Sequence, residues 1–217
     1  MHMNQLVIGN KNYSSWSLRP WLLLREKGIA FTETIIPLYM DNSKEALLQY
    51  SPAGMVPVLL QGDITIWDSM AICEHIAESY PEKGCWPKDP TARAFARSIS
   101  YEMHSGFFSI RNTLPMNCRQ KMVFDNISPE LASDIARICE IWRTCREQSG
   151  ATGDYLFGAF SIADAMFAPI VLRFNSYGIK VGELEQQYMD SMLANGSVRE
   201  WVEAGILEKE IIEICEM

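Results

Sequence analysis

The sequence predicts an α/β domain followed by an all-helical domain. Up to about residue 80, short apolar runs alternate with helical patterns, and no convincing strand is found after residue 90. Between these parts, residues 81–90 contain three prolines and one glycine, a composition typical of a linker. Alternating strands and helices are typical of a mixed sheet covered by helices. We therefore expect a first domain over residues 1–82 and a second over residues 90–217.

The first domain is expected to follow the order β-α-β-α-β-β-α. The predicted strands cover residues 6–8, 32–36, 58–60 and 64–67, and the last two flank a Gln-Gly-Asp turn typical of a hairpin. The predicted helices cover residues 18–27, 43–50 and 70–80. Gly28 ends the first helix, and Asp68 or Ser69 caps the third.

The second domain is expected to consist of helices alone. Helical patterns cover residues 91–111, 129–146, 162–177 and 183–193, with shorter helices towards the C-terminus.

Composition excludes several classes of partner. The net charge of -8 leaves no basic surplus for nucleic acid or an anionic membrane surface. No run reaches the roughly 18 apolar residues that span a bilayer, and the N-terminus lacks a signal-peptide pattern, so we expect a cytoplasmic protein. The six cysteines are scattered without a Cys-x-x-Cys pair, which favours reduced core residues over disulfides or a metal site.

The first candidate site is the pair Ser14 and Ser15. Proline is best tolerated in the first turn of a helix, so Pro20 predicts a helix start at about residues 15–18. The serines then lie where free N–H groups and the helix dipole favour an anion, and a hydroxyl there can donate to a bound thiolate. The alternative is that they only cap the helix.

Two further segments have the chemistry to bind a peptide-like ligand. Pro57 leaves Val56 extended, so that the backbone of Val56 can pair with another chain. At the next helix start, Ser69 and the first N–H groups can hold a carboxylate, and Asp68 can hold an ammonium group. An ordinary turn and plain helix capping are the alternatives. Together the three segments indicate a tripeptide site.

These residues resemble motifs of the serine-type glutathione transferases. Ser14-Ser15 with Arg19-Pro20 and Gly28 is similar to the family's first helix, and Ser51-Pro-Ala-Gly-Met-Val-Pro57 is similar to its cis-proline loop. Asp68-Ser69-Met-Ala-Ile72 resembles its Glu-Ser-x-Ala-Ile motif, and Phe160-Ser-Ile-Ala-Asp164 resembles the capping box of its helical domain. The resemblance implies a thioredoxin-like domain plus a helical bundle, the glutathione transferase fold, in a homodimer without a metal.

The resemblance also assigns roles. Ser14, or else Ser15, would stabilise the thiolate of glutathione, the co-substrate. Met55, Val56 and Pro57 would meet its cysteinyl part, and Asp68 and Ser69 its γ-glutamyl end. A pocket for the electrophile is expected on the helix after the linker, with Phe107 near it; its candidate residues are Trp16, Tyr101, His104, Phe108 and Arg111. Arg173 would either meet an acidic substrate or extend along the surface.

The chain departs from the family pattern in three places. The Ser-Ser start looks most like the zeta, or maleylacetoacetate isomerase, branch, but Trp16 stands where that branch has cysteine. Met55 replaces a polar residue, and Asp68 is one methylene shorter than the usual Glu. The leading expectation is a detoxification-type transferase. The alternatives are a glutathione-dependent isomerase with a basic pocket and a non-catalytic transferase-like binding protein.

Overall fold

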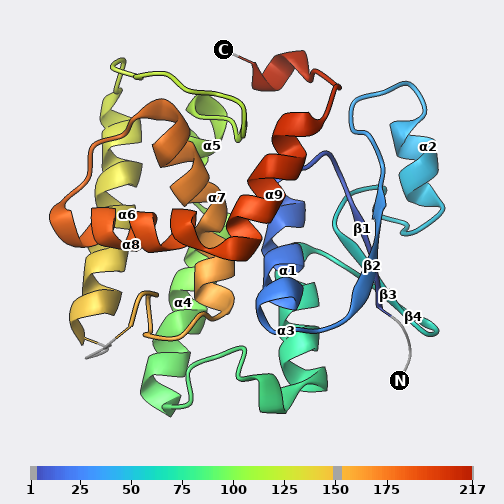
Figure 1. Cartoon of the computed structure of the whole chain (residues 1–217), viewed down its shortest axis with the longest axis horizontal. Coiled ribbons are helices and arrows are strands. Elements are labelled where there is room, and N and C mark those ends of the chain that lie inside the picture. The colour runs from blue at the N-terminus through green and yellow to red at the C-terminus, as the bar shows by residue number, and fades with distance from the viewer. Residues whose placement is uncertain (1–3, 149–152, 217) are drawn as a thin grey trace.

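A four-stranded sheet lies on one side of the molecule and most of the helices on the other (Figure 1). The computed structural model describes residues 4–148 and 153–216. The strands are β1 (Asn4–Ile8), β2 (Phe31–Ile35), β3 (Val58–Gln61) and β4 (Ile64–Trp67), in the order β2-β1-β3-β4. β1 runs parallel to β2 and antiparallel to β3, and β3 and β4 form the predicted hairpin around Gly62.

The two faces of the sheet are covered by different helices. Side chains alternate along a strand, so Leu6 and Ile8 of β1 join the main core whereas Val7 points to the other face. The main-core face is covered by α1 (Ser15–Glu26) and α3 (Ser69–Ser79). On the other face, Leu47 of α2 (Ser43–Leu48) packs with Val7 and Val58.

The second half is helical, as predicted, but its first helix is shorter than expected. After the 3-10 turn η1 (Pro81–Lys83), α4 (Pro90–Ser105) ends at Gly106, and Phe107 adopts a left-handed conformation with φ of 60° before α5 (Phe108–Thr113). The prediction of one helix over residues 91–111 is therefore wrong. The remaining elements are α6 (Pro129–Gln148), α7 (Ile162–Tyr177), α8 (Glu183–Ala194), α9 (Gly196–Leu207) and the 3-10 turn η2 (Glu213–Cys215).

The start of α7 has the predicted capping arrangement. Asp164 accepts hydrogen bonds from the N–H of Ser161 at 2.8 Å, from its hydroxyl at 3.0 Å and from the N–H of Leu156 at 3.0 Å. Burial raises the pKa of Asp164 to about 6, and these hydrogen bonds offset only part of that shift. The capping box thus fixes both the first turn of α7 and the loop before it.

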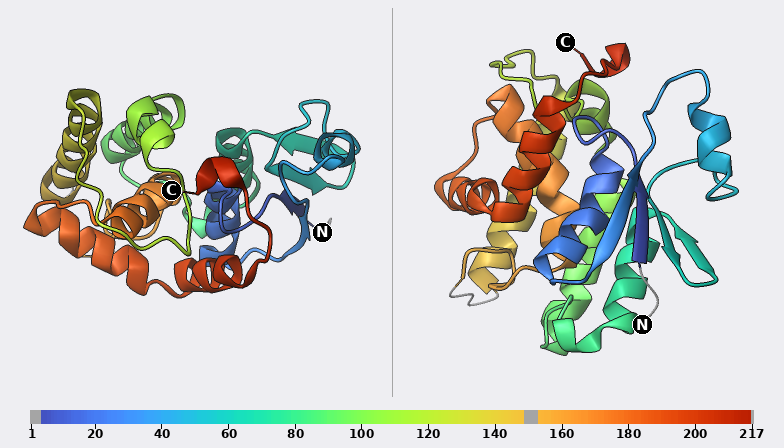
Figure 2. Two further views of the ribbon diagram at one scale, coloured as in Figure 1. Left: turned by 90° about the horizontal axis from the view of Figure 1, so that it is seen from above. Right: turned by 45° about the vertical axis from the view of Figure 1, so that its right-hand side comes forward.

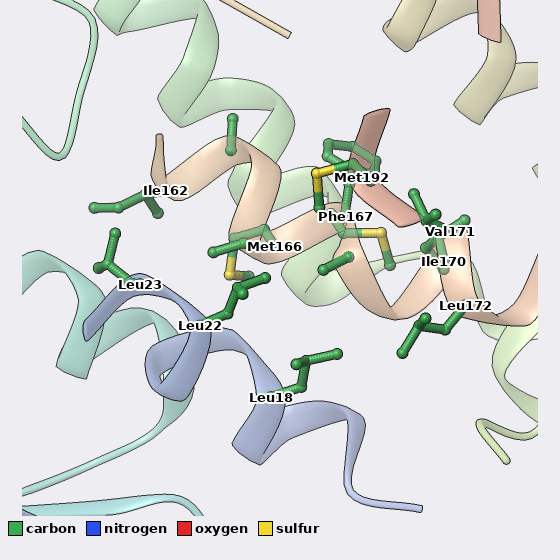
Figure 3. Close-up of a cluster of buried hydrophobic side chains, with 14 of the residues drawn as sticks. Leu18, Leu22, Leu23, Ile162, Met166, Phe167, Ile170, Val171, Leu172 and Met192 are labelled. Carbon is green, nitrogen blue, oxygen red and sulfur yellow. The ribbon is translucent and has the colours of Figure 1, made fainter. Parts of the chain in front are cut away.

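One continuous apolar core joins the two halves. Leu22 of α1 lies beside Met166 of α7, and both side chains, like Leu18 of α1 and Ile170 of α7, are fully buried in the same cluster (Figure 3). Burying one such side chain contributes roughly 1.5–3 kcal/mol, so this contact holds the halves in a fixed relation. The C-terminal segment around η2 then passes over the start of α1 (Figure 2).

None of the helices in residues 4–148 and 153–216 is long and apolar enough to cross a membrane. All six cysteines carry free thiols, and four of them are buried.

Candidate functional site

The start of α1 places both candidate serines at one cavity. Ser14 is the N-cap and Ser15 the first helical residue, as predicted. The hydroxyl of Ser14 accepts from the N–H of Ser17 at 3.4 Å and donates to the Ser17 hydroxyl at 2.8 Å. Ser14 therefore does cap the helix, and a ligand that takes its O–H would replace the bond to Ser17. The first-turn prediction for Pro20 is wrong, because α1 begins at Ser15 and Pro20 lies inside it.

The loop before β3 presents unpaired backbone groups. The Val56–Pro57 peptide bond is cis, Val56 is half-buried and Met55 is 66% exposed. Within the described parts of the chain, neither the N–H nor the C=O of Val56 forms a hydrogen bond. These two groups are available to an extended peptide ligand.

At the start of α3, the carboxylate of Asp68 already has several partners. Its Oδ1 accepts from the N–H groups of Met70 at 2.8 Å and Ala71 at 3.1 Å, and its Oδ2 lies 3.1 Å from Nε2 of His104. Partial burial raises the pKa of Asp68, but the hydrogen bonds from His104, Ala71 and Met70 outweigh it and hold the pKa below its ordinary value. The carboxylate is therefore charged at neutral pH.

Unlike Asp68, the neighbouring Ser69 has a side chain without a hydrogen-bond partner among the described residues. The residue is 1% exposed, and its hydroxyl has no hydrogen-bond partner among the residues that the structure describes. A buried hydroxyl without a partner is costly to leave unsatisfied. Because Ser69 lines a cavity, a ligand group there would satisfy it.

Two adjoining cavities connect these segments. The serine cavity, of about 570 Å³, is lined by Ser14, Ser15 and Val56, with the side chains of α2 and the preceding loop opposite. The Asp68 cavity, of about 450 Å³, is lined by Val56, Pro57, Asp68 and Ser69. Trp16, Met55 and Val56 belong to both linings. Each volume is within the roughly 300–1,000 Å³ of a small-molecule site.

The predicted electrophile pocket is only partly assembled. Trp16 lines both cavities, His104 meets its ring edge-on at 5.2 Å, and the guanidinium of Arg111 lies 4.8 Å from it. Tyr101 and Phe108, by contrast, are 49% and 66% exposed and line neither cavity. For Phe108 the physical reason is the break at Phe107, which ends the helical face of α4 before residue 108; Tyr101 lies within α4 but is exposed there.

Arg173 does not extend along the surface. It is 5% exposed within α7, and its Nε donates to the carbonyl of Leu114 at 2.7 Å. The surface alternative stated for this residue is therefore wrong.

The C-terminal segment contributes a wall that sequence reasoning missed. Cys215 lines the serine cavity, and Glu216 accepts from the hydroxyl of Tyr13 and from the side-chain amide of Asn117. Arg119 in turn donates to the Tyr13 hydroxyl. Burial raises the pKa of the Cys215 thiol, so this side chain lines the cavity as a neutral thiol and not as a thiolate. No motif marks this segment, because only the fold brings residue 215 to residue 14.

No cluster of three or more His, Cys, Asp or Glu side chains in residues 4–148 and 153–216 is arranged to hold a metal ion. The polar groups at the two cavities include the hydroxyls of Ser14, Ser15 and Ser69 and the carboxylate of Asp68.

Comparison with known proteins supports the reading of the first domain. Residues 13–79 match the family model of the glutathione S-transferase N-terminal domain. A probable maleylacetoacetate isomerase from Caenorhabditis elegans is 33% identical over 99 residues, 46% of either chain. Glutathione S-transferase omega-1 from Rattus norvegicus is 28% identical over 138 residues, 63% of this chain and 55% of that one. The matches thus span about half the length of these two relatives.

The fold extends over nearly the whole chain. A crystal structure of a glutathione transferase homologue from Burkholderia gl BGR1, with bound glutathione, superposes with a TM-score of 0.71 at 22% identity. The alignment covers 94% of this chain and 98% of that one. The predicted thioredoxin-like domain with a helical domain behind it is therefore confirmed.

Proposed function

Because residues 13–79 match the glutathione S-transferase N-terminal domain and the whole chain has the fold of a glutathione transferase homologue, we propose that it is a glutathione transferase that holds glutathione as a thiolate for attack on a small electrophile. The single observation that carries this proposal is the pair of adjoining cavities. They bring the start of α1, the Val56 loop and the start of α3 around one continuous space. A tripeptide with one thiol, an ammonium group and two carboxylates matches the donors and acceptors found there.

Each segment would bind one part of glutathione. The free N–H and C=O of Val56 would pair with the cysteinyl backbone in the manner of an added strand. The unsatisfied hydroxyl of Ser69 and the first N–H groups of α3 would hold the γ-glutamyl carboxylate, and Asp68 its ammonium group. The thiol then lies towards the serine cavity, beside Ser14 and Ser15.

Catalysis would come from thiolate stabilisation and from holding two substrates together. We assign Ser14 as the donor to the thiolate. Its hydroxyl hydrogen now serves only another hydroxyl, Ser17, which also accepts from the N–H of Gly9 at 3.1 Å. Turning that O–H to a charged sulfur would exchange a neutral hydrogen bond for a stronger charge-assisted one.

The relatives include both an isomerase and an omega transferase, so the zeta branch remains a prediction. A homodimer and a cytoplasmic location also remain predictions. Met55, exposed on the shared wall, offers no polar contact to glutathione, and we expect modest affinity.

The test is a calorimetric titration of glutathione into the wild type, Ser14→Ala and Ser15→Ala, with ultraviolet absorbance reporting the bound thiolate. We expect all three to bind glutathione and only Ser14→Ala to lose the thiolate. A hydrogen bond to a charged group contributes roughly 1.5–3 kcal/mol, so the pKa of the bound thiol should rise by about one to two units in Ser14→Ala.

Ser98→Ala is the matched control, because Ser98 is exposed on α4 and its hydroxyl bonds only to the carbonyl of Ala94. Loss of the thiolate in Ser15→Ala instead would move the role to Ser15. Absence of glutathione binding by the wild type would overturn the enzyme proposal and leave a transferase fold that binds another partner.

A further inference from the structure

Three arginines from three helices lie near one another: the guanidiniums of Arg19 and Arg111 both contact the Trp16 ring, and Arg173 is close enough to interact electrostatically with both. Arg19 of α1 is fully buried, Arg173 of α7 is 5% exposed, and Arg111 of α5 is half-buried. Burial, and then repulsion by Arg111 and Arg173, lowers the pKa of Arg19; burial, and then Arg111, lowers that of Arg173 to about 10. We call these three residues the arginine cluster.

The cluster lacks the partners that buried cations normally have. Among the described residues, none of the three nitrogens of Arg19 has a hydrogen-bond partner, and neither does Nη1 of Arg173. Arg111 donates only to backbone carbonyls, of Gly106 at 2.9 Å and of Met103 and His104. No carboxylate in the described residues forms an ion pair with any member of the cluster, although Arg25, Arg97, Arg119, Arg137 and Arg143 all have one.

The nearby acids are engaged elsewhere. Asp68 binds His104 and two amides of α3, and Asp134 accepts from the N–H groups of Ser109 at 3.0 Å and Ile110 at 3.3 Å. Removing an ion from water costs several kcal/mol per ion unless hydrogen bonds and an opposite charge compensate it. The fold therefore keeps positive charge in its interior without supplying the anion.

The cluster is next to the proposed reaction space. The Trp16 ring, which lines both cavities, lies 4.3 Å from the guanidinium of Arg19 and 4.8 Å from that of Arg111. Trp16 itself is 36% exposed. Trp16 thus lies against both cavities and against two arginines of the cluster, and a ligand that reaches the cluster from the cavities would have to displace it.

We propose that the arginine cluster binds a carboxylate of the second substrate, so that the enzyme acts on anionic electrophiles. The planar guanidinium matches a carboxylate through two parallel hydrogen bonds, and the unpartnered nitrogens of Arg19 provide them. As a substrate assignment this rests on the proposed function, but carboxylate binding itself needs no glutathione. The two can therefore be tested separately.

The binding test uses 3-nitrobenzoate and its methyl ester, titrated without glutathione. The wild type should bind the acid more tightly than the ester. In Arg19→Met, affinity for the acid should fall by at least about tenfold, because a buried charge pair is lost. Affinity for the neutral ester should stay within about twofold, as expected where no charged contact is removed. Arg25→Met, on the same helix but exposed, removes the same charge and should change neither.

Arg173→Gln is the second variant, because its Nη1 is unpartnered while its Nε supports Leu114. It should also weaken the acid selectively. Equal binding of acid and ester by the wild type, or unchanged acid binding in both variants, would overturn the proposal. So would an equal loss of glutathione affinity in Arg19→Met, since the cluster would then serve glutathione itself.

The kinetic test uses 4-chloro-3-nitrobenzoate and its methyl ester with glutathione. The thiolate sulfur bonds to the carbon that carries chlorine, and chloride leaves with the C–Cl electron pair. The ratio of kcat/KM for acid over ester should fall by at least about tenfold in Arg19→Met. If the wild type binds 3-nitrobenzoate but never glutathione, the proposed function fails while the anion site stands.

Discussion

Asp164 and Arg19 are both fully buried ionisable side chains, but they differ in the partners that the fold provides for their charges. Asp164 accepts three hydrogen bonds, all from residues within eight positions of it in the chain. Arg19 has no hydrogen-bond partner among the described residues, and after burial the largest influences on its pKa are two other arginines, Arg111 and Arg173, which lower it. The cost of burial is partly offset by local hydrogen bonds at Asp164, whereas Arg19 has no hydrogen bond to offset it among the described residues.

This contrast indicates that the charge of Asp164 has a structural role and that of Arg19 a functional one. A buried polar group that organises its own surroundings is part of the scaffold, since its partners are built into adjacent sequence. A buried charge that lowers stability without a partner is typical of a site prepared for a ligand. The predictions that follow test whether this distinction holds in the energetics.

The largest effect is expected from Asp164→Ala. The variant loses three hydrogen bonds to a charged acceptor, and the free energy of unfolding should fall by about 3–5 kcal/mol. Urea denaturation at neutral pH measures it. Asp190→Ala, at an exposed position of α8, is the control and should change stability by less than about 0.5 kcal/mol. A loss in Asp164→Ala as small as that of the control would contradict the structural role of the capping box.

The difference between partners nearby in the chain and partners far apart in it also explains which features the sequence could predict. The Ser-x-x-Asp spacing and the Ser14, Val56 and Asp68 segments are local patterns, and the helix starts that they predict are confirmed. The turn at Phe107 is signalled only by Gly106, and it places Phe108 on a separate helix, away from the cavities. Arg19 and Arg173 are 154 positions apart, so their proximity depends on how α1 packs against α7 and on no local pattern.

A second, smaller effect should have the opposite sign. Arg19→Met replaces an unpartnered buried charge by an apolar side chain, and we expect it to raise the free energy of unfolding by about 1–3 kcal/mol. The matched variant is Arg143→Met, whose partner Glu185 is buried with 1% of its side chain exposed. Leaving that carboxylate unpaired should lower stability by about 2–3 kcal/mol. If both substitutions destabilise equally, Arg19 has a structural role and the contrast with Asp164 disappears.

The last expected effect is gradual, a pH dependence carried by Asp164. Its pKa of about 6 in the folded protein lies above its ordinary value of 3.8, so between these values the folded state binds more protons than the unfolded state. The stability contributed by this group is fully present below about pH 4 and is lost as pH rises to about 6, with a slope of up to about 1.4 kcal/mol per pH unit.

Asp164→Asn isolates this contribution, because it cannot titrate while every other carboxylate of the protein is retained. The difference in unfolding free energy between wild type and variant should therefore fall as pH rises from about 4 to 6, with the slope given by proton linkage. Urea denaturation at several pH values measures both proteins. A difference that grows with pH would mean that the hydrogen bonds from Ser161 and Leu156 outweigh burial and depress the pKa. The charge at residue 164 would then be fully compensated, which would make its contrast with Arg19 larger.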